Sequence, residues 1–236
     1  MIVERWRGSP AEFHARALPR SLTEMTAWVF APERPALVLG SGQRDEVADL
    51  QRAQARGIEV VRRRSGGGAV LLIPGDCLWI DVLLPRNDRR WVDDVGLSAD
   101  WLGDTWCRSL AKLGVAGALH RGRLERTGWG PLVCFAALGP GEVTVDGRKV
   151  VGISQRRTRD VARFQCLVHR VWDPQLLLDL LRLSADDRIR GRAELRDAAA
   201  GPGIPLDNLE AALIAELDSG SRKPVTDGAV PPARPA

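Results

Sequence analysis

The chain has 236 residues, 44% hydrophobic and 27% charged, which leaves room for one sizeable α/β domain with a small addition and is typical of a globular protein. Its 34 Lys and Arg against 30 Asp and Glu give a net charge of +4, a modest excess that suits an anionic small molecule or an acidic protein partner. No apolar run approaches the roughly 20 residues of a membrane helix and the first ten residues lack the apolar core of a signal peptide, so we expect a cytoplasmic protein with no membrane partner.

Short apolar runs alternate with turn residues in the first half of the chain. We predict a strand near Ile2–Trp6, a helix around Thr23–Phe30, a strand at Ala36–Leu39, a helix over Arg44–Arg56, strands at Ile58–Arg62, Ala69–Ile73 and Cys77–Leu84, and a helix over Asp93–Leu113. The Cys77–Leu84 run is apolar at nearly every position, which is typical of a strand inside a sheet. Leu102, Trp106 and Leu110 recur at helical spacing in the last of these elements.

A hairpin and a helical end are predicted in the second half of the chain. We predict strands at Leu132–Ala137, Gly141–Val145, Lys149–Arg156 and Arg163–Val171, and helices at Gln175–Leu183 and Asn208–Leu217. Asp146-Gly147 is a strong signal for a two-residue hairpin turn, and Asp207 with Glu210 could form a capping box. We therefore expect a catalytic domain over residues 1–172, a short helical addition over 173–218, and a disordered tail over 219–236, which is rich in Pro, Gly and Ala.

The four cysteines, Cys77, Cys107, Cys134 and Cys166, form no C-x-x-C pair and have no histidine neighbours at zinc-like spacing. We expect reduced thiols and no structural metal. The arginines lack the interleaved aromatic residues and the recognised modules of nucleic-acid-binding proteins. A nucleic acid is therefore not expected as a partner.

The segment RRRSGGGAV, residues 62–70, lies between two predicted strands. Three successive glycines let backbone N–H groups approach an anion closely, with positive φ available at each position. The arginines before the glycines add fixed positive charge, so the segment suits a carboxylate or a phosphate. It is neither a P-loop, because no G-K-[ST] follows, nor a dinucleotide fingerprint, because its spacing differs and no helix follows. A flexible hairpin turn is an equally good interpretation of these residues.

A second segment, DGRKVVGISQRR at residues 146–157, places a lysine at the start of a predicted strand. Alternation along this strand puts Lys149, Val151, Ile153 and Gln155 on one face. A lysine among apolar and amide neighbours is a candidate for a partly buried ammonium that stabilises negative charge during group transfer. A solvent-exposed lysine on an edge strand is the commoner outcome at such a position.

The two segments together resemble the lipoate–protein ligase and octanoyltransferase family, which is related in fold to the biotin–protein ligases. The matching residues are Arg62, Arg63, Ser65, Gly66, Gly67, Gly68, Ala69 and Val70, followed about 80 residues later by Gly147, Arg148, Lys149 and Gly152, with Ser154 in the SQRR run. The resemblance covers roughly residues 30–172. It implies an α/β (α+β) fold like that of class II synthetases and biotin ligases, with a central mixed, mainly antiparallel sheet flanked by helices.

The resemblance also implies an activity. In ligases of the family, the carboxylate of lipoate or octanoate attacks ATP with Mg²⁺ present, and a lysine of a lipoyl-domain or glycine-cleavage-H-type carrier protein then attacks the acyl adenylate. Lys149 would stabilise negative charge in both steps. The residues expected to bind the acyl substrate are Arg62, Arg63, Ser65, Gly66, Gly67, Gly68, Ala69, Gly152 and Ser154.

Departures from the family pattern leave other activities open. Leu72 and Ile73 stand where members usually have His-Asp, and Cys166, which we expect to pack in the core, stands in place of a later histidine. Cys134 precedes a phenylalanine just before the lysine hairpin, which resembles a branch of octanoyltransferases whose matching cysteine forms an acyl thioester without ATP. A buried cysteine in a strand is the alternative. The altered pocket also leaves open a pseudoenzyme that binds an acyl or adenylate ligand without catalysis.

Overall fold

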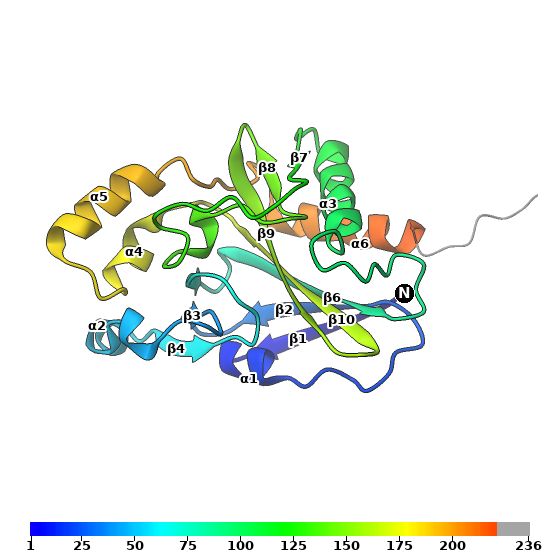
Figure 1. Cartoon of the computed structure of the whole chain (residues 1–236), viewed down its shortest axis with the longest axis horizontal. Helices are drawn as coiled ribbons and strands as arrows, with labels where there is room; N and C mark the ends of the chain where they lie inside the picture. The colour runs from blue at the N-terminus through cyan, green and yellow to red at the C-terminus, as the bar shows by residue number, and fades with distance from the viewer. Residues whose placement is uncertain (221–236) are drawn as a thin grey trace, which may run out of the picture.

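The computed structural model describes residues 1–220 and folds into two β-sheets with helices around them (Figure 1). The larger sheet has the strand order β1 (Ile2–Gly8), β2 (Thr26–Pro32), β6 (Cys77–Pro85), β10 (Val161–His169), β9 (Arg148–Arg157), β8 (Val143–Val145) and β7 (Ala118–Leu119). The smaller sheet has the order β4 (Glu59–Arg62), β3 (Ala36–Leu39) and β5 (Val70–Leu72). In these two sheets, β1 pairs with β2 and β3 with β4 in parallel, and the other neighbours are antiparallel. The expected mixed, mainly antiparallel arrangement is confirmed.

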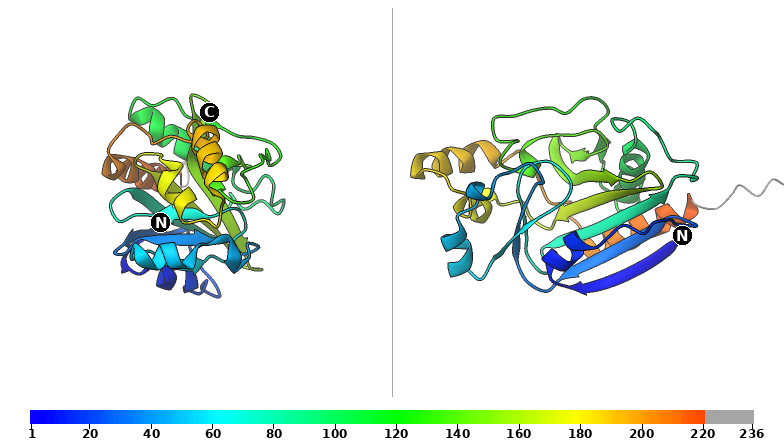
Figure 2. Two further views of the ribbon diagram at one scale, coloured as in Figure 1. Left: turned by 90° about the vertical axis from the view of Figure 1, so that its left-hand side faces the viewer. Right: turned by 60° about the horizontal axis from the view of Figure 1, so that its bottom comes forward.

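Helices lie around the two sheets, some of them at either end of the molecule (Figures 1 and 2). They are α1 (Pro10–Ala15), α2 (Leu50–Ala55), α3 (Asp100–Lys112), α4 (Pro174–Asp179), α5 (Ala185–Leu195) and α6 (Leu206–Ser219), with 3-10 turns at Asp45–Val47 and Cys134–Ala136. In Figure 1, α3 and α6 occupy one end, and α4 and α5 the other. Within the described part of the chain, no helix has the length and apolar character needed to cross a membrane.

The period of two along a strand gives the larger sheet two different faces. On β6, Leu78, Ile80 and Val82 belong to a core that includes buried residues of α3 and α6. The intervening Trp79 and Leu83 belong to a second core, which the smaller sheet helps to form. The space between the two sheets is where the candidate site lies.

The chain beyond residue 172 packs against both parts of the molecule. Leu177 and Leu181 join Leu37 of β3 in a third core on the outer side of the smaller sheet. Leu209 and Leu213 of α6 belong to the core behind the larger sheet. The division of the chain at residue 172 stays a prediction, and residues 221–236 of the predicted tail lie outside the described residues.

Several predicted elements are wrong in kind or in length. Residues 26–32 form a buried strand in place of the predicted helix, because this apolar run pairs with β6 inside the larger sheet. Residues 132–137 contain a 3-10 turn in place of a strand, with only a single bridge from Val133 to Ala69. The helix expected over 44–56 is divided, because Ala48 is extended and the Asp49 side chain caps α2.

The remaining differences concern helix ends. α3 begins at Asp100, seven residues after the predicted start, since the preceding residues form turns. The expected capping box of α6 is absent, because the N-cap residue is Pro205. α5 was not predicted: only Gly191 and Leu195 of this helix are buried, so its sequence shows little apolar periodicity.

Candidate active site

Lys149 enters the site from the hairpin between β8 and β9. Asp146 and Gly147 form the predicted two-residue hairpin turn, and their φ values of 50° and 73° are those that a type I′ turn requires. A register shift after Val143 brings Lys149 opposite Thr144. The side chain of Lys149 is only 3% exposed, so the buried ammonium is the correct interpretation of this position.

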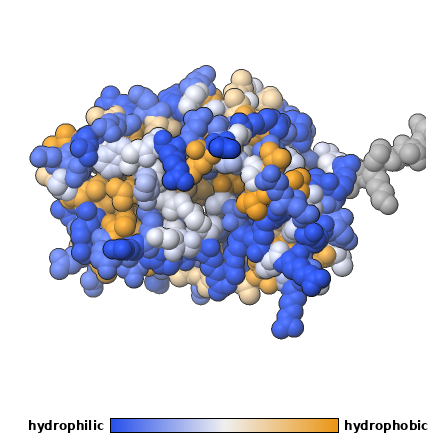
Figure 3. Space-filling model, viewed as in Figure 1, coloured by the Kyte–Doolittle hydropathy of each residue, from blue (hydrophilic) through white to orange (hydrophobic). Residues whose placement is uncertain are grey.

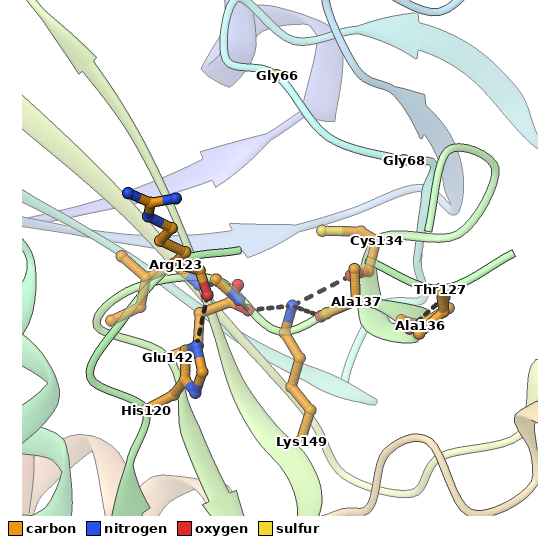
Figure 4. Close-up of polar contacts among 12 residues, drawn as sticks. Gly66, Gly68, His120, Arg123, Thr127, Cys134, Ala136, Ala137, Glu142 and Lys149 are labelled. Atoms are coloured by element: carbon orange, nitrogen blue, oxygen red, sulfur yellow. Dashed lines mark hydrogen bonds and ion pairs between the residues drawn. The ribbon is translucent and has the colours of Figure 1, made fainter. Parts of the chain in front are cut away.

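Every hydrogen of the Lys149 ammonium has an acceptor (Figure 4). Its Nζ donates to the carbonyl oxygens of Cys134, at 3.1 Å, and Ala137, at 3.0 Å. A third contact, at 2.7 Å, is an ion pair with Oε2 of Glu142. Glu142 is also buried and accepts hydrogen bonds from the backbone N–H groups of Gly139 and Ile153. The lysine therefore ties the Cys134–Ala137 segment to β9, with its charge balanced by a carboxylate.

Arg63 donates hydrogen bonds to carbonyl oxygens of the glycine loop and so fixes its conformation. It is 4% exposed and donates from Nη2 to the carbonyl oxygens of Gly66 and Gly68, both at 2.8 Å. Its Nη1 has no hydrogen-bond partner among the described residues, and no carboxylate there forms an ion pair with it. Arg63 thus supplies a buried positive charge with a free N–H group beside the loop.

Two of the glycines are required, Gly67 by its backbone conformation and Gly68 by a close backbone contact. Gly67 has φ of 100°, a region that L side chains rarely adopt. A Cβ on Gly68 would lie 2.6 Å from backbone atoms of Val133, which no side chain can accept. The glycine loop therefore packs directly on the segment that carries Cys134.

Ser65 fixes the loop to the floor of the site through side chains of β9 and β10. Its Oγ lies 3.0 Å from Oγ of Ser154 and donates to Oε1 of Gln165 at 3.0 Å. The amide of Gln165 in turn contacts the buried carboxylate of Asp81, which pairs with Arg163. Burial raises the pKa of Asp81, and the Arg163 guanidinium opposes that shift.

A narrow apolar pocket, called the tunnel below, lies between the two sheets. Its walls are formed by His14, Arg63, Val70, Leu72, Trp79, Cys134, Phe135, Gly152, Ile153, Ser154, Gln165, Cys166 and Leu167. A wider cleft of about 590 Å³, bordered by Gly66–Gly68 and Lys149, shares Cys134, Ile153 and Ser154 with the tunnel. The space-filling view shows a hollow near the centre of this side, with hydrophobic residues in its walls (Figure 3).

Cys134 lies where the tunnel meets the cleft. Its side chain is half-buried, and its sulfur lies 3.9 Å from where a Cβ of Gly67 would be. In Figure 4 the sulfur of Cys134 and the ammonium of Lys149 project to the same side of the segment, below Gly66 and Gly68. The sulfur of Cys134 is therefore accessible at the junction of the two cavities.

The other sequence-predicted residues divide into two groups. Gly152 and Ser154 line the tunnel, whereas Arg62 points away from it, donating to Gly40 and pairing with Asp45. Ala69 is buried at the end of β5 and lines neither cavity. Sequence reasoning missed Glu142 and His14.

The departures from the family pattern make the site more apolar. Leu72 lines the tunnel, and Cys166 is buried in the core with Phe164, as expected. Burial raises the pKa of the Cys166 thiol, so it is not a nucleophile at neutral pH. Within the described cleft, Glu142 is the one carboxylate in the lining and is already engaged by Lys149. These residues do not fit a Mg²⁺ site, which usually takes one or two free carboxylates.

Comparisons with known proteins identify the family of this chain. The family described as the lipoyl protein ligase A/B catalytic domain matches residues 13–200. Octanoyltransferase LipM of Kyrpidia tusciae is 30% identical over 201 residues, covering 80% of this chain and 72% of that protein. The solved bipartite lipoate protein ligase of Thermoplasma acidophilum superimposes with a TM-score of 0.72 at 18% identity, covering 92% of this chain and 82% of that one. Lipoate-protein ligase A bound with ATP gives 0.65 at 16% identity, covering 92% and 84%.

The fold and these matches define the class of the protein: it is an enzyme of the ligase or acyltransferase type. The chain belongs to the lipoyl protein ligase A/B catalytic domain family. The resemblance of the two sequence segments to this family is thereby confirmed.

Proposed function

We propose that the protein transfers a medium-chain acyl group, octanoyl or lipoyl, to a lysine of a lipoyl-domain carrier protein through a thioester on Cys134. The observation that carries the proposal is the place of Cys134, where an apolar tunnel opens into a wider cleft. The named relative, an octanoyltransferase, supports the same reaction. The Thermoplasma ligase was solved as part of a lipoylation system with its E2 lipoyl domain, which supports a carrier of that kind.

The reaction needs an acyl donor that is already activated, such as an acyl thioester. The sulfur of Cys134 attacks the acyl carbon, a new carbon–sulfur bond forms, and the donor leaves as a thiol that takes up the proton of Cys134. The neutral amine of the carrier lysine then attacks the Cys134 thioester. An amide bond forms, the carbon–sulfur bond breaks, and the proton from the amine returns to the sulfur.

The surrounding residues position these steps. The ammonium of Lys149 donates to the carbonyl oxygen of Cys134 and so holds the backbone at that position. Lys149 also lines the wall of the cleft. Arg63 lines the tunnel beside Cys134, and its Nη1 is free to donate to the oxygen on which negative charge develops. The apolar walls exclude water that would hydrolyse the thioester.

ATP-dependent activation, the first expectation from the sequence, is the second candidate. The size of the cleft favours it, because a volume of about 590 Å³ bordered by the glycine loop and Arg126 exceeds what an acyl carboxylate needs. The poor fit of the lining residues to Mg²⁺ counts against it. ATP with Mg²⁺ is therefore one of the conditions of the transfer assay below.

A transfer assay separates these candidates. Purified protein is given an octanoyl or lipoyl thioester, or the free acid with ATP and Mg²⁺, together with a lipoyl-domain or glycine-cleavage-H-type carrier. We expect transfer from the thioester without ATP, loss of transfer in Cys134→Ser, and a thioester adduct on Cys134 by mass spectrometry when the carrier is omitted. Cys107→Ser is the matched control and should keep its activity, because Cys107 is partly exposed and lines neither cavity.

Two results would overturn the proposal. Full transfer by Cys134→Ser with ATP and free acid would select the ligase reaction instead. A ligand-induced rise in melting temperature without any product, from any donor, would indicate a protein that only binds the acyl group.

A further inference from the structure

Ser154 carries the hydroxyl group at the junction of the tunnel and the cleft. Three of the described residues line both cavities, namely Cys134, Ile153 and Ser154. Ser154 lies on β9 and its side chain is half-buried. Its Oγ has one hydrogen-bond partner in the described part of the chain, Oγ of Ser65, at 3.0 Å. Because a hydroxyl has one donor and two acceptor positions, this contact leaves Ser154 able to bind a ligand at the junction.

A buried carboxylate fixes the direction of the hydrogen bonds beneath this junction. Asp81 accepts from Nε1 of Trp79 at 2.8 Å and pairs with the guanidinium of Arg163, and both of these groups can only donate. The side-chain amide of Gln165 lies 3.4 Å from the same carboxylate. Its NH₂ group must face Asp81, because the opposite orientation would bring two oxygen acceptors together. The amide oxygen of Gln165 therefore faces Ser65.

This orientation makes the oxygen of Ser154 an acceptor on the side of the cavities. Ser65 uses its only hydroxyl proton to donate to Oε1 of Gln165 at 3.0 Å. The 3.0 Å contact between the two serine oxygens then requires the proton of Ser154. Turning that proton towards a ligand would give up a hydrogen bond and leave two oxygens facing each other. Ser154 thus favours a ligand that donates an N–H or O–H group.

We propose that Ser154 is a further catalytic residue, which accepts a hydrogen bond from the attacking amine of the carrier lysine. The proposal rests on the acyl transfer proposed above and concerns its second step. The neutral amine has two N–H groups besides the lone pair that attacks the acyl carbon. One of its protons passes to the sulfur of Cys134 as the carbon–sulfur bond breaks, and the other remains on the nitrogen of the amide product. Ser154 holds this second N–H.

The hydrogen bond to Ser154 strengthens during the reaction. As the carbon–nitrogen bond forms, the nitrogen gains positive charge, and hydrogen bonds from charged donors are stronger than those from neutral ones. An interaction that is stronger in the transition state than in the bound substrate raises the rate of the step. A thiolate has no N–H or O–H group to donate, so Ser154 gives no such help when a thiol enters or leaves. Ser154 therefore favours an amine over a thiol as the group that receives the acyl chain.

The test separates the two kinds of attack on the octanoyl adduct of Cys134. The adduct is formed with an octanoyl thioester, freed of excess donor, and divided between the carrier protein and a small thiol, and the products are followed by mass spectrometry. We expect Ser154→Ala to slow transfer to the carrier about tenfold at saturating carrier, the value of about one hydrogen bond to a charged donor. Formation of the adduct and its attack by the thiol should stay within about threefold of the wild-type rates.

Ser154→Thr is the matched variant, because it keeps the hydroxyl in a residue that strands favour. It should transfer to the carrier within about threefold of the wild-type rate. Formation of the adduct shows that each variant folds. Equal slowing of the amine and thiol reactions in Ser154→Ala would overturn the proposal, as would unchanged transfer to the carrier or a loss in Ser154→Thr as large as that in Ser154→Ala.

Failure of the proposed function gives a different result. A wild-type protein that forms no adduct on Cys134 but transfers octanoate with ATP would overturn the thioester step and leave the same amine attacking an acyl adenylate. Ser154→Ala should then still slow transfer to the carrier about tenfold, and unchanged transfer would refute the role of Ser154. A wild-type protein without transfer from any donor would overturn both proposals.

Discussion

Replacing Glu142 with Gln removes the carboxylate that pairs with the buried ammonium of Lys149. The two groups are 2.7 Å apart, and both side chains are almost fully inaccessible to solvent. At an effective dielectric constant of about 20, a pair at this distance attracts by roughly 6 kcal/mol. Removing one partner of such a pair costs about 3–5 kcal/mol, because the remaining charge stays buried. The amide also presents N–H groups where Gly139 and Ile153 need an acceptor.

We therefore expect Glu142→Gln to lower the free energy of unfolding by about 3–5 kcal/mol in urea denaturation. The double variant Glu142→Gln with Lys149→Met should lose less than the sum of the two single variants, by at least about 2 kcal/mol. Asp76→Asn, which breaks the exposed pair with Arg170, is the matched control and should cost less than about 1 kcal/mol. Additive single effects, or a cost below about 1 kcal/mol for Glu142→Gln, would refute the coupling of the two charges.

Three further outcomes follow from the site and its surroundings. Burial raises the pKa of the Cys77 thiol to about 12 and also raises that of Cys166. Iodoacetamide at neutral pH should therefore label neither thiol in the native protein. Rapid labelling of Cys166, detected by mass spectrometry, would contradict its burial. The pKa of His14 is lowered to about 3 and that of His169 to about 4, so the unfolded chain binds more protons than the folded protein between about pH 6.5 and 4. The free energy of unfolding should therefore be highest above pH 6.5 and fall by about 1.4 kcal/mol per pH unit for each histidine as the pH drops. The slope should flatten in the double variant His14→Phe with His169→Phe. Gly68→Ala should reduce both the melting temperature and the transfer activity. Gly66→Ala, whose Cβ would meet nothing within 4 Å, should leave the melting temperature within a few degrees of the wild-type value. Equal melting temperatures for the two variants would contradict the close packing at Gly68.

Local patterns predicted most strands but could not resolve every apolar run. Cys77–Pro85, apart from Asp81, and Ala36–Leu39 are short apolar runs followed by turn residues, so sequence alone identifies them. The run at 26–32 has the same composition, and its pairing with β6 decides that it is a strand. α5 escapes prediction for the opposite reason, since it is mostly polar and is held by few buried residues.

The sequence predicted the site where the chain carries a compact motif and failed where folding brings single residues together. The glycine loop and Lys149 lie along one cleft, as the two segments indicated. Glu142 belongs to no motif, and its contact with Lys149 depends on the hairpin between β8 and β9. His14 is more than 50 residues away from every other residue of the tunnel except Arg63, so no spacing rule could connect it to the site.

The tunnel walls come from positions as distant as 14 and 167. During synthesis, a ribosome-bound chain that has not yet produced β9 and β10 lacks the tunnel floor, even though its glycine loop is complete. Such long-range closure is slow in folding. The pocket beside Cys134 is therefore complete only after β9 and β10 have been synthesised.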